Sequence, residues 1–308
     1  MSDAEVSLVV EQTDPLVAEL LSDLGVPERV NYAAGVLLDD EDFSSEQSYL
    51  RGRLARALAA LYGFGTIAGL AVSCAAADNP DREVKVSPGL ALDRLGRLVE
   101  VRREQCLRLV QWFAYEATRG DARRAELLAA RVDDPDNAGR QRLFLDVSLR
   151  FAICPHGKTP AFAAGPFNAT DYVVSARLAD AFEITLDLAP LVAGVPLAPQ
   201  SSLPPLDEEL AEIAGLAADQ RAAARRRWAV DAALAAWPGA DPVDPTRLPK
   251  LREQRLAGDW LKVVLARLAV PISQESAAAP PLVDTTRAVV ADNYLRPVVF
   301  NPLRWQGM

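Results

Sequence analysis

The region spanning residues 31–101 places the strongest constraint on how this chain can fold. Its first half carries apolar residues three, four or seven positions apart, the spacing of one helix face: Phe43, Leu50, Leu54, Leu58 and Leu61. Asp39 is the expected N-cap, with Asp42 in the capping-box position three residues later. The helix is predicted to end at Gly63 and Gly65, and we expect its apolar and aromatic residues to build a core.

The second half of this region predicts a compact antiparallel β unit. Residues 66–73 have the pattern of a strand in which Gly69 allows another backbone to approach closely. Polar and apolar residues alternate over residues 83–86, as in a half-buried strand, and residues 98–101 return as a further strand. The helix therefore leads directly into a small sheet.

Two turns are expected within this β unit. Pro88-Gly89 is predicted to occupy positions i+1 and i+2 of a type II turn, which requires a positive φ at Gly89. A bulky residue at Gly89 should then be strongly destabilising. The second turn spans Asp93–Arg97 and contains Gly96.

Length and charge limit the class of protein. The 308 residues suffice for two domains, and the net charge of -9 argues against a nucleic-acid binder or docking on anionic lipid. Three cysteines suggest a reducing compartment rather than a disulfide framework. No basic region precedes the first apolar run, and no run approaches about 18 apolar residues, so we expect neither a secretory signal nor membrane insertion. A cytoplasmic location is predicted.

Residues 1–190 are predicted to form an α+β core domain. It should contain helices over residues 14–24 and 104–131, a long strand over 143–153, a loop over 154–170 and a strand over 182–186. The strand over 143–153 shows the clearest alternation of apolar and polar residues in the chain.

The carboxy-terminal part has a different composition. Residues 191–206 are a proline-rich linker. Helical stretches over 207–237 and 249–270 predict an antiparallel helical hairpin spanning 207–270, and the tail over 271–308 is expected to be extended and to return to the core domain. The fold class predicted overall is α+β: a mixed or antiparallel β domain with a long amphipathic helix and a C-terminal helical hairpin.

Two patterns resemble ligand-binding motifs but lack the sequence context that those motifs require. Gly63, Gly65 and Gly69 approximate a phosphate-binding fingerprint, yet the last gap is one residue too long, and they follow a helix and enter a strand. The acidic run Asp39–Asp42 lacks the alternating ligands and distal glutamate of a calcium loop. Neither a cofactor nor a metal is predicted.

The sequence also gives no catalytic assignment. A single residue separates Cys154 from His156, the only histidine, and this spacing does not suit a nucleophile pair. Cys74 and Cys106 are isolated in the sequence, so the four ligands of a zinc site are not indicated. No G-x-S-x-G elbow is present. Carboxylate pairs remain open, because 42 acidic residues offer many pairings and the sequence selects none.

Several consecutive motifs are specific in combination. They are an aromatic-x-x-Gly-x-Leu-Leu start at Tyr32–Leu38, an Asp-Phe-x-x-Glu-Gln-x-Tyr helix entry at Asp42–Tyr49, a Leu-x-Gly-x-Gly-x-x-x-Gly-Leu-x-Val hinge at Leu61–Val72, a Val-x-Val-x-Pro-Gly-x-Ala-Leu-Asp-x-x-Gly-Arg hairpin at Val84–Arg97, a strand ending in Cys-Pro at Leu145–Pro155 and a Tyr-x-x-Ser segment at Tyr172–Ile184. Together they resemble a family of proteins associated with phage-tail-like contractile injection systems. The hairpin motif is also similar to β units of phage baseplate and tail-fibre proteins.

This resemblance covers residues 31–186 and implies a non-enzymatic structural or adaptor component, at the baseplate or another end of the tail. Its partners would be other subunits of a contractile injection particle assembled in the cytoplasm. Many relatives carry a cysteine-rich loop after the Cys-Pro pair, whereas here only Cys154 remains, so no metal or disulfide role is carried over. The segment 207–270 lies outside the resemblance.

Two alternatives from other functional classes stay open. One is a free-standing cytoplasmic scaffold whose 207–270 hairpin recruits a helical partner. The other is an enzyme of unknown class, with acidic residues and His156 around a pocket. Deleting the hairpin would test the first alternative, and a polar pocket at His156 or at the acidic helix start would favour the second.

Overall fold

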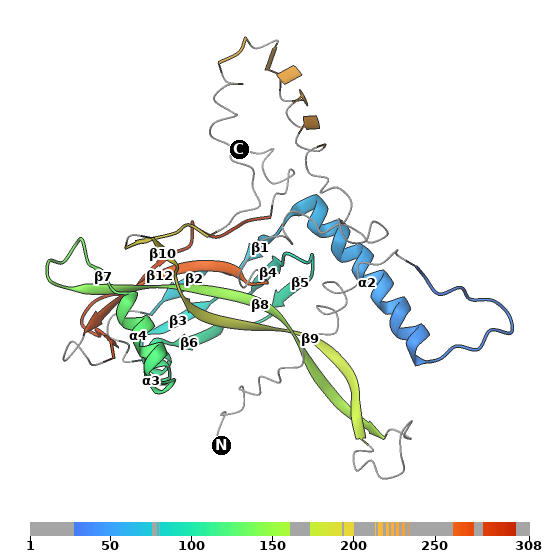
Figure 1. The fold of residues 1–308 in the computed structure, drawn as a ribbon, viewed down its shortest axis with the longest axis horizontal. Coiled ribbons are helices and arrows are strands. Elements are labelled where there is room, and N and C mark those ends of the chain that lie inside the picture. The colour runs from blue at the N-terminus through green and yellow to red at the C-terminus, as the bar shows by residue number, and fades with distance from the viewer. Residues whose placement is uncertain are drawn as a thin grey trace.

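The computed structural model describes residues 28–75, 79, 81–160, 173–192, 194–199, 261–273 and 280–299, with scattered positions between 213 and 234. Within these residues the protein has an α+β fold, in which helices flank antiparallel sheets (Figure 1). The predicted helix over residues 14–24 lies outside the described residues. Described positions from 220 to 234 are helical, in keeping with the first predicted helix of the 207–270 segment.

The elements follow one another along the chain as helix, meander, helices and large sheet. The helices are α2 (Asp40–Tyr62), α3 (Leu109–Thr118) and α4 (Asp121–Ala129). The early strands are β1 (Gly65–Gly69), β2 (Val72–Cys74), β3 (Glu83–Val86), β4 (Gly89–Leu92), β5 (Leu98–Val101) and β6 (Gln105–Arg108). The later strands are β7 (Val132–Asp133), β8 (Gln141–Pro160), β9 (Val173–Leu188), β10 (Leu191–Val192), β11 (Val195–Pro196), β12 (Val263–Ser273), β13 (Leu282–Val283) and β14 (Val290–Asp292).

Strands β1 to β6 form a meander of three passes, each bent near its middle. The passes are β1–β2, β3–β4 and β5–β6, so that one half of each pass joins the sheet β1-β4-β5 and the other half joins β2-β3-β6. The first pass bends at Gly69 and Leu70, which both have positive φ. The Leu70 N–H donates to the Pro88 carbonyl and the Ser87 N–H to the Ala71 carbonyl, so neighbouring bends remain hydrogen-bonded.

Helix α2 begins where the sequence predicts. The Asp39 carboxylate accepts hydrogen bonds from the backbone N–H groups of Glu41 and Asp42, while the Asp42 carboxylate accepts from the Asp39 N–H, all at 3.1 Å. This is the predicted capping box. At the other end Gly63 has a φ of 69° and donates its N–H to the Ala59 carbonyl. Both helix ends therefore satisfy backbone groups that would otherwise lack partners.

The predicted core-facing side of α2 is wrong. Phe43, Leu50, Leu54 and Leu61 are between 52% and 71% exposed, Leu58 is half-buried, and the buried residues of α2 are Ala55 and Ala59. The physical reason is the close approach of the Asp93–Arg97 turn, because a Cβ atom at Gly96 would lie 1.8 Å from the Ala55 carbonyl oxygen. Only the small-residue face of the helix can approach a backbone so closely.

The prediction of a type II turn at Pro88-Gly89 is also wrong. Gly89 begins strand β4, where it pairs with Gly69 on one side and Val101 on the other, and its φ is not positive. Glycine is required at this position because the neighbouring backbone is close. A Cβ atom there would lie 2.4 Å from the Ala68 carbonyl oxygen and 2.5 Å from the Leu70 nitrogen. The turn that sets the register of the β4–β5 hairpin is the one over Asp93–Arg97, which contains Gly96.

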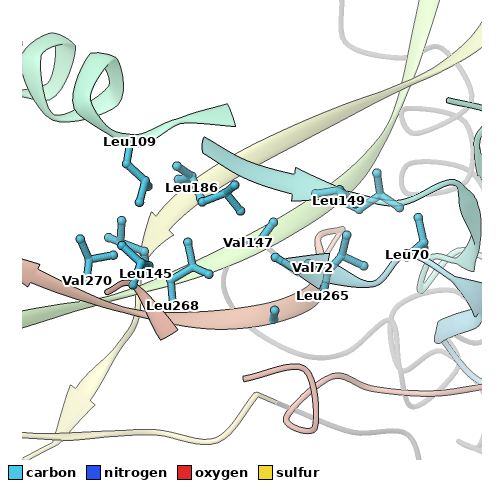
Figure 2. Close-up of a cluster of buried hydrophobic side chains, with 14 of the residues drawn as sticks. Leu70, Val72, Leu109, Leu145, Val147, Leu149, Leu186, Leu265, Leu268 and Val270 are labelled. Atoms are coloured by element: carbon cyan, nitrogen blue, oxygen red, sulfur yellow. The ribbon is translucent and has the colours of Figure 1, made fainter. Parts of the chain in front are cut away.

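The main core lies where the meander meets the large sheet. In that sheet β12 pairs with β8 on one edge and with β13 and β14 on the other, while β8 also pairs with β7 and β9. Figure 2 shows buried side chains from both parts packed together: Leu70, Val72, Leu109, Leu145, Val147, Leu149, Leu186, Leu265, Leu268 and Val270. Strands from residues far apart in the sequence thus share one hydrophobic cluster.

One charged pair is enclosed within this sheet. Arg267 of β12 lies directly opposite Asp146 of β8, and its Nε and Nη2 atoms are 2.7 and 2.9 Å from the two carboxylate oxygens. The side chains are only 5% and 8% exposed. The two N–H groups and two oxygens form a bidentate pair, so this charge is compensated where water has little access.

Four stretches adopt a different secondary structure from the one predicted. The second helix of the C-terminal hairpin is wrong over residues 263–270, because they belong to β12. Residues 105–108 form β6 rather than the start of a helix. Residues 154–160 continue β8 rather than opening a loop, and in the predicted linker β10 pairs with β11. In each case strand pairing outweighs local composition.

Candidate protein interaction site

The residues predicted to be structural gather largely where α2 passes into the meander. Gly63 ends α2, and Gly65 lies against the chain near residue 297, where a Cβ atom would be 2.5 Å from the Pro297 carbonyl oxygen. A Cβ atom at Gly69 would be 2.2 Å from the Pro88 carbonyl oxygen. Gly65 and Gly69 are therefore needed for backbone contacts, whereas Gly63 ends the helix. Asp39 and Phe43 lie at the opposite end of α2.

The Asp93–Arg97 turn is tied together by a buried carboxylate. Asp93 accepts hydrogen bonds from the backbone N–H groups of Leu95 and Arg97 and pairs with the Arg97 guanidinium at 2.7 Å. The Arg97 guanidinium lies 4.4 Å from the Phe151 ring centre, and Arg94 lies 3.6 Å from that of Phe64. This turn joins the meander both to β8 and to the end of α2.

The side of α2 opposite the buried alanines carries a row of exposed apolar side chains. We call the residues Phe43, Leu50, Leu54 and Leu61 the outer seam; each is more than half exposed. Figure 1 shows α2 extending from the body with one side uncovered by the other described elements. Exposed apolar residues arranged in one row mark a surface that gains from contact with a protein.

A second exposed feature is the far end of the β8–β9 hairpin. We call residues 154–159 and 175–180 the β arm; all of them are exposed, and the arm extends away from the sheet (Figure 1). Cys154 lies opposite Ala179, and His156 lies opposite Arg177. His156 is therefore an exposed arm residue, and it does not line any of the three described pockets.

A groove that the sequence did not indicate lies between α3 and residues 183–187 of β9. It encloses about 370 Å³ and is lined in part by Trp112, Tyr115, Glu116, Arg123 and Asp187. Glu116 is only 3% exposed and accepts hydrogen bonds from Arg119 and Arg123. The acidic group is thus already paired within the helices. The sequence shows only that Glu116 is close to Arg119 and Arg123, and its burial in the groove depends on tertiary contacts.

Asp284 anchors the carboxy-terminal strands. Burial raises the pKa of this carboxyl, but hydrogen bonds from the hydroxyl and N–H of Thr286 and from Arg287 outweigh burial and lower the pKa to about 2. Arg287 also bonds to Asp134 at 2.9 Å and to the carbonyl of Ile272 at 3.0 Å. One ionised carboxylate therefore holds the arginine that joins β12 to the segment between β7 and β8.

The lowered pKa of Asp284 predicts that the folded protein loses stability at low pH. Its folded-state pKa is below the value of 3.8 for an unperturbed carboxyl, so its contribution is present above pH 4 and is lost as the pH falls towards about 2. We expect Asp284→Asn to flatten this part of the stability curve, measured by urea unfolding between pH 2 and 5. Asp121→Asn, at a side chain 98% exposed, is the matched control and should leave the curve unchanged.

Within the described residues, no group of three or more histidine, cysteine, aspartate or glutamate side chains is placed to hold a metal ion. Among the same residues, no helix has the length and apolar character required to cross a membrane. Neither protein-family models nor curated proteins give a match to this chain.

Proposed function

We propose that this protein is a non-enzymatic structural or adaptor subunit of a phage-tail-like contractile injection particle, acting through contacts with neighbouring subunits. The proposal rests on the motif combination over residues 31–186 and on one structural observation, the exposed β arm. In this proposal the chain is assembled into the particle in the cytoplasm, at the baseplate or another end of the tail.

The β arm supports a role in assembly because of its exposure. A two-stranded ribbon is only marginally stable in water, and a third strand or a packed surface is usually needed to hold it. Within the described chain, residues 154–159 and 175–180 pair only with each other and with no third strand. A neighbouring subunit that packed on the arm or paired with its edge would supply the missing contacts.

The experiment compares particles assembled with wild-type chain and with two variants. Leu178→Asp places a charge on the arm at a leucine that is 60% exposed, and Val195→Asp makes the same change at a valine 65% exposed in β11. Tagged full-length chains are purified from the source cells, and the co-sedimenting material is imaged by electron microscopy. We expect tail-like particles with the wild type and Val195→Asp, and about tenfold less Leu178→Asp per particle.

Two results would contradict the proposal. One is co-sedimented material without tail-like particles. The other is a particle that assembles and contracts at the normal rate when this chain is absent altogether. Equal incorporation of Leu178→Asp and the wild type would contradict the role of the arm.

A further inference from the structure

We propose that the outer seam of α2 binds the same seam of a second copy of this chain, forming a parallel two-stranded coiled coil. The inference goes beyond the proposed function, because it concerns the isolated chain and does not depend on any particle. Three features of α2 support this dimer: the spacing of the seam residues, the anchoring of the opposite face and the charges that flank the seam.

The seam residues have coiled-coil spacing. Phe43 and Leu50 are seven residues apart, Leu54 follows four later, and Leu61 follows seven after that, which assigns Phe43 and Leu50 to heptad position d and Leu54 and Leu61 to position a. The two remaining core positions are Gln47 at a and Ala57 at d. Along α2, all six of these positions are exposed.

The opposite face is fixed to the body. Ala55 and Ala59 fall at positions b and f, away from the a and d row, and both are buried. Ala55 lies against the turn at Gly96. The helix is therefore held in place with its a and d row turned outward, so a partner helix binds a surface that needs no further ordering.

The flanking charges favour a parallel arrangement of two copies. Glu46 is at position g and Arg51 at position e, five residues later. In a parallel pair, g of one helix meets the following e of its partner, so Glu46 faces Arg51 on both sides of the seam. In an antiparallel pair, e faces e and g faces g, which places Arg51 near Arg51 and Arg53 near Arg53. Like charges there oppose the antiparallel arrangement.

The contacts that these charged groups make within the chain leave them accessible. Glu46 accepts a hydrogen bond from the Tyr32 hydroxyl at the surface. Arg51 lies 3.7 Å from Asp180, with side chains 44% and 71% exposed. An exposed ion pair of this kind contributes little to the stability of the chain. Arg51 can therefore leave Asp180 and pair with Glu46 of a second copy at little cost in free energy. Gln47 at a core position favours pairing in one register.

The first test measures the mass of the purified full-length chain by sedimentation over a range of concentrations. We expect a reversible dimer for the wild type and a monomer for the double variant Leu50→Glu/Leu54→Glu. Ser45→Glu, at an exposed f position of the same helix, is the control and should remain dimeric. Circular dichroism and thermal unfolding establish that each variant is folded. A folded wild-type chain that is monomeric at every concentration overturns the proposal, as does a dimer unaffected by the double variant.

The second test addresses orientation. Glu46→Arg and Arg51→Glu should each weaken the dimer about tenfold, and the combined variant should restore it. Gln47→Cys, in a chain with Cys74, Cys106 and Cys154 changed to serine, should form a disulfide between copies under oxidising conditions, because parallel helices bring position 47 beside itself. Failure of both the charge rescue and the cross-link overturns the parallel arrangement. A monomeric wild type leaves the particle proposal untouched, so the two can fail separately.

Discussion

Replacing Gly96 with valine is expected to lower the free energy of unfolding by about 3–5 kcal/mol, through backbone strain and overpacking together. Gly96 has a φ of +83°, which a β-branched residue adopts only at a cost, and its Cβ would lie 1.8 Å from the Ala55 carbonyl oxygen. Relief of that overlap requires α2 to move away from the meander. Urea unfolding of the two proteins measures the difference directly.

Gly139→Val separates strain from contact. Gly139 has a φ of +73°, similar to Gly96, but nothing lies within 4 Å of an added Cβ atom. Its substitution should cost only the strain, about 1–3 kcal/mol. If the two variants lost the same stability, close contact between α2 and the turn would contribute nothing, and the account of why α2 buries its alanines would be incorrect.

Substituting Arg267 with methionine is expected to destabilise the protein by about 3–5 kcal/mol, because it leaves the Asp146 carboxylate buried without its partner. The Asp146 side chain is 8% exposed, and the residue lies in β8 between Arg267 of β12 and Asp187 of β9. Arg102→Met provides the comparison, since Arg102 and Glu100 form a pair with side chains 81% and 53% exposed. That change should cost under about 1 kcal/mol.

The double variant Arg267→Met/Asp146→Val tests the physical reason. If the cost comes from an unpaired buried charge, removal of both charges should recover most of the lost stability. A double variant as unstable as Arg267→Met alone would show that the loss comes instead from the packing of the arginine side chain. Thermal unfolding of the wild type, single and double variants supplies the comparison.

Local signals in the sequence were sufficient for the elements that depend on near neighbours. The capping box at Asp39 and the end of α2 at Gly63 involve residues at most four positions apart, and both were predicted correctly. The strand over 143–153 was also predicted, because alternation is a local pattern. These features need no knowledge of distant partners.

Features set by distant partners could not be predicted in this way. Residues 263–270 are rich in leucine, valine and alanine, which suit a buried helix as well as a buried strand. Only the pairing with β8, more than a hundred residues earlier, selects the strand. Similarly, helical periodicity revealed that α2 has an apolar row, but it could not show that the alanines on the other side approach the Gly96 turn.

The position of β12 in the sheet has a consequence for synthesis of the chain. Residues 143–149 of β8 pair with β12, yet Val263 leaves the ribosome only after about 75 further residues have followed the end of β9. At typical rates of about 5–20 residues per second, this takes about 4–15 s. During that interval the nascent chain carries an apolar strand with one unpaired edge, which makes it vulnerable to aggregation and a natural substrate for chaperones.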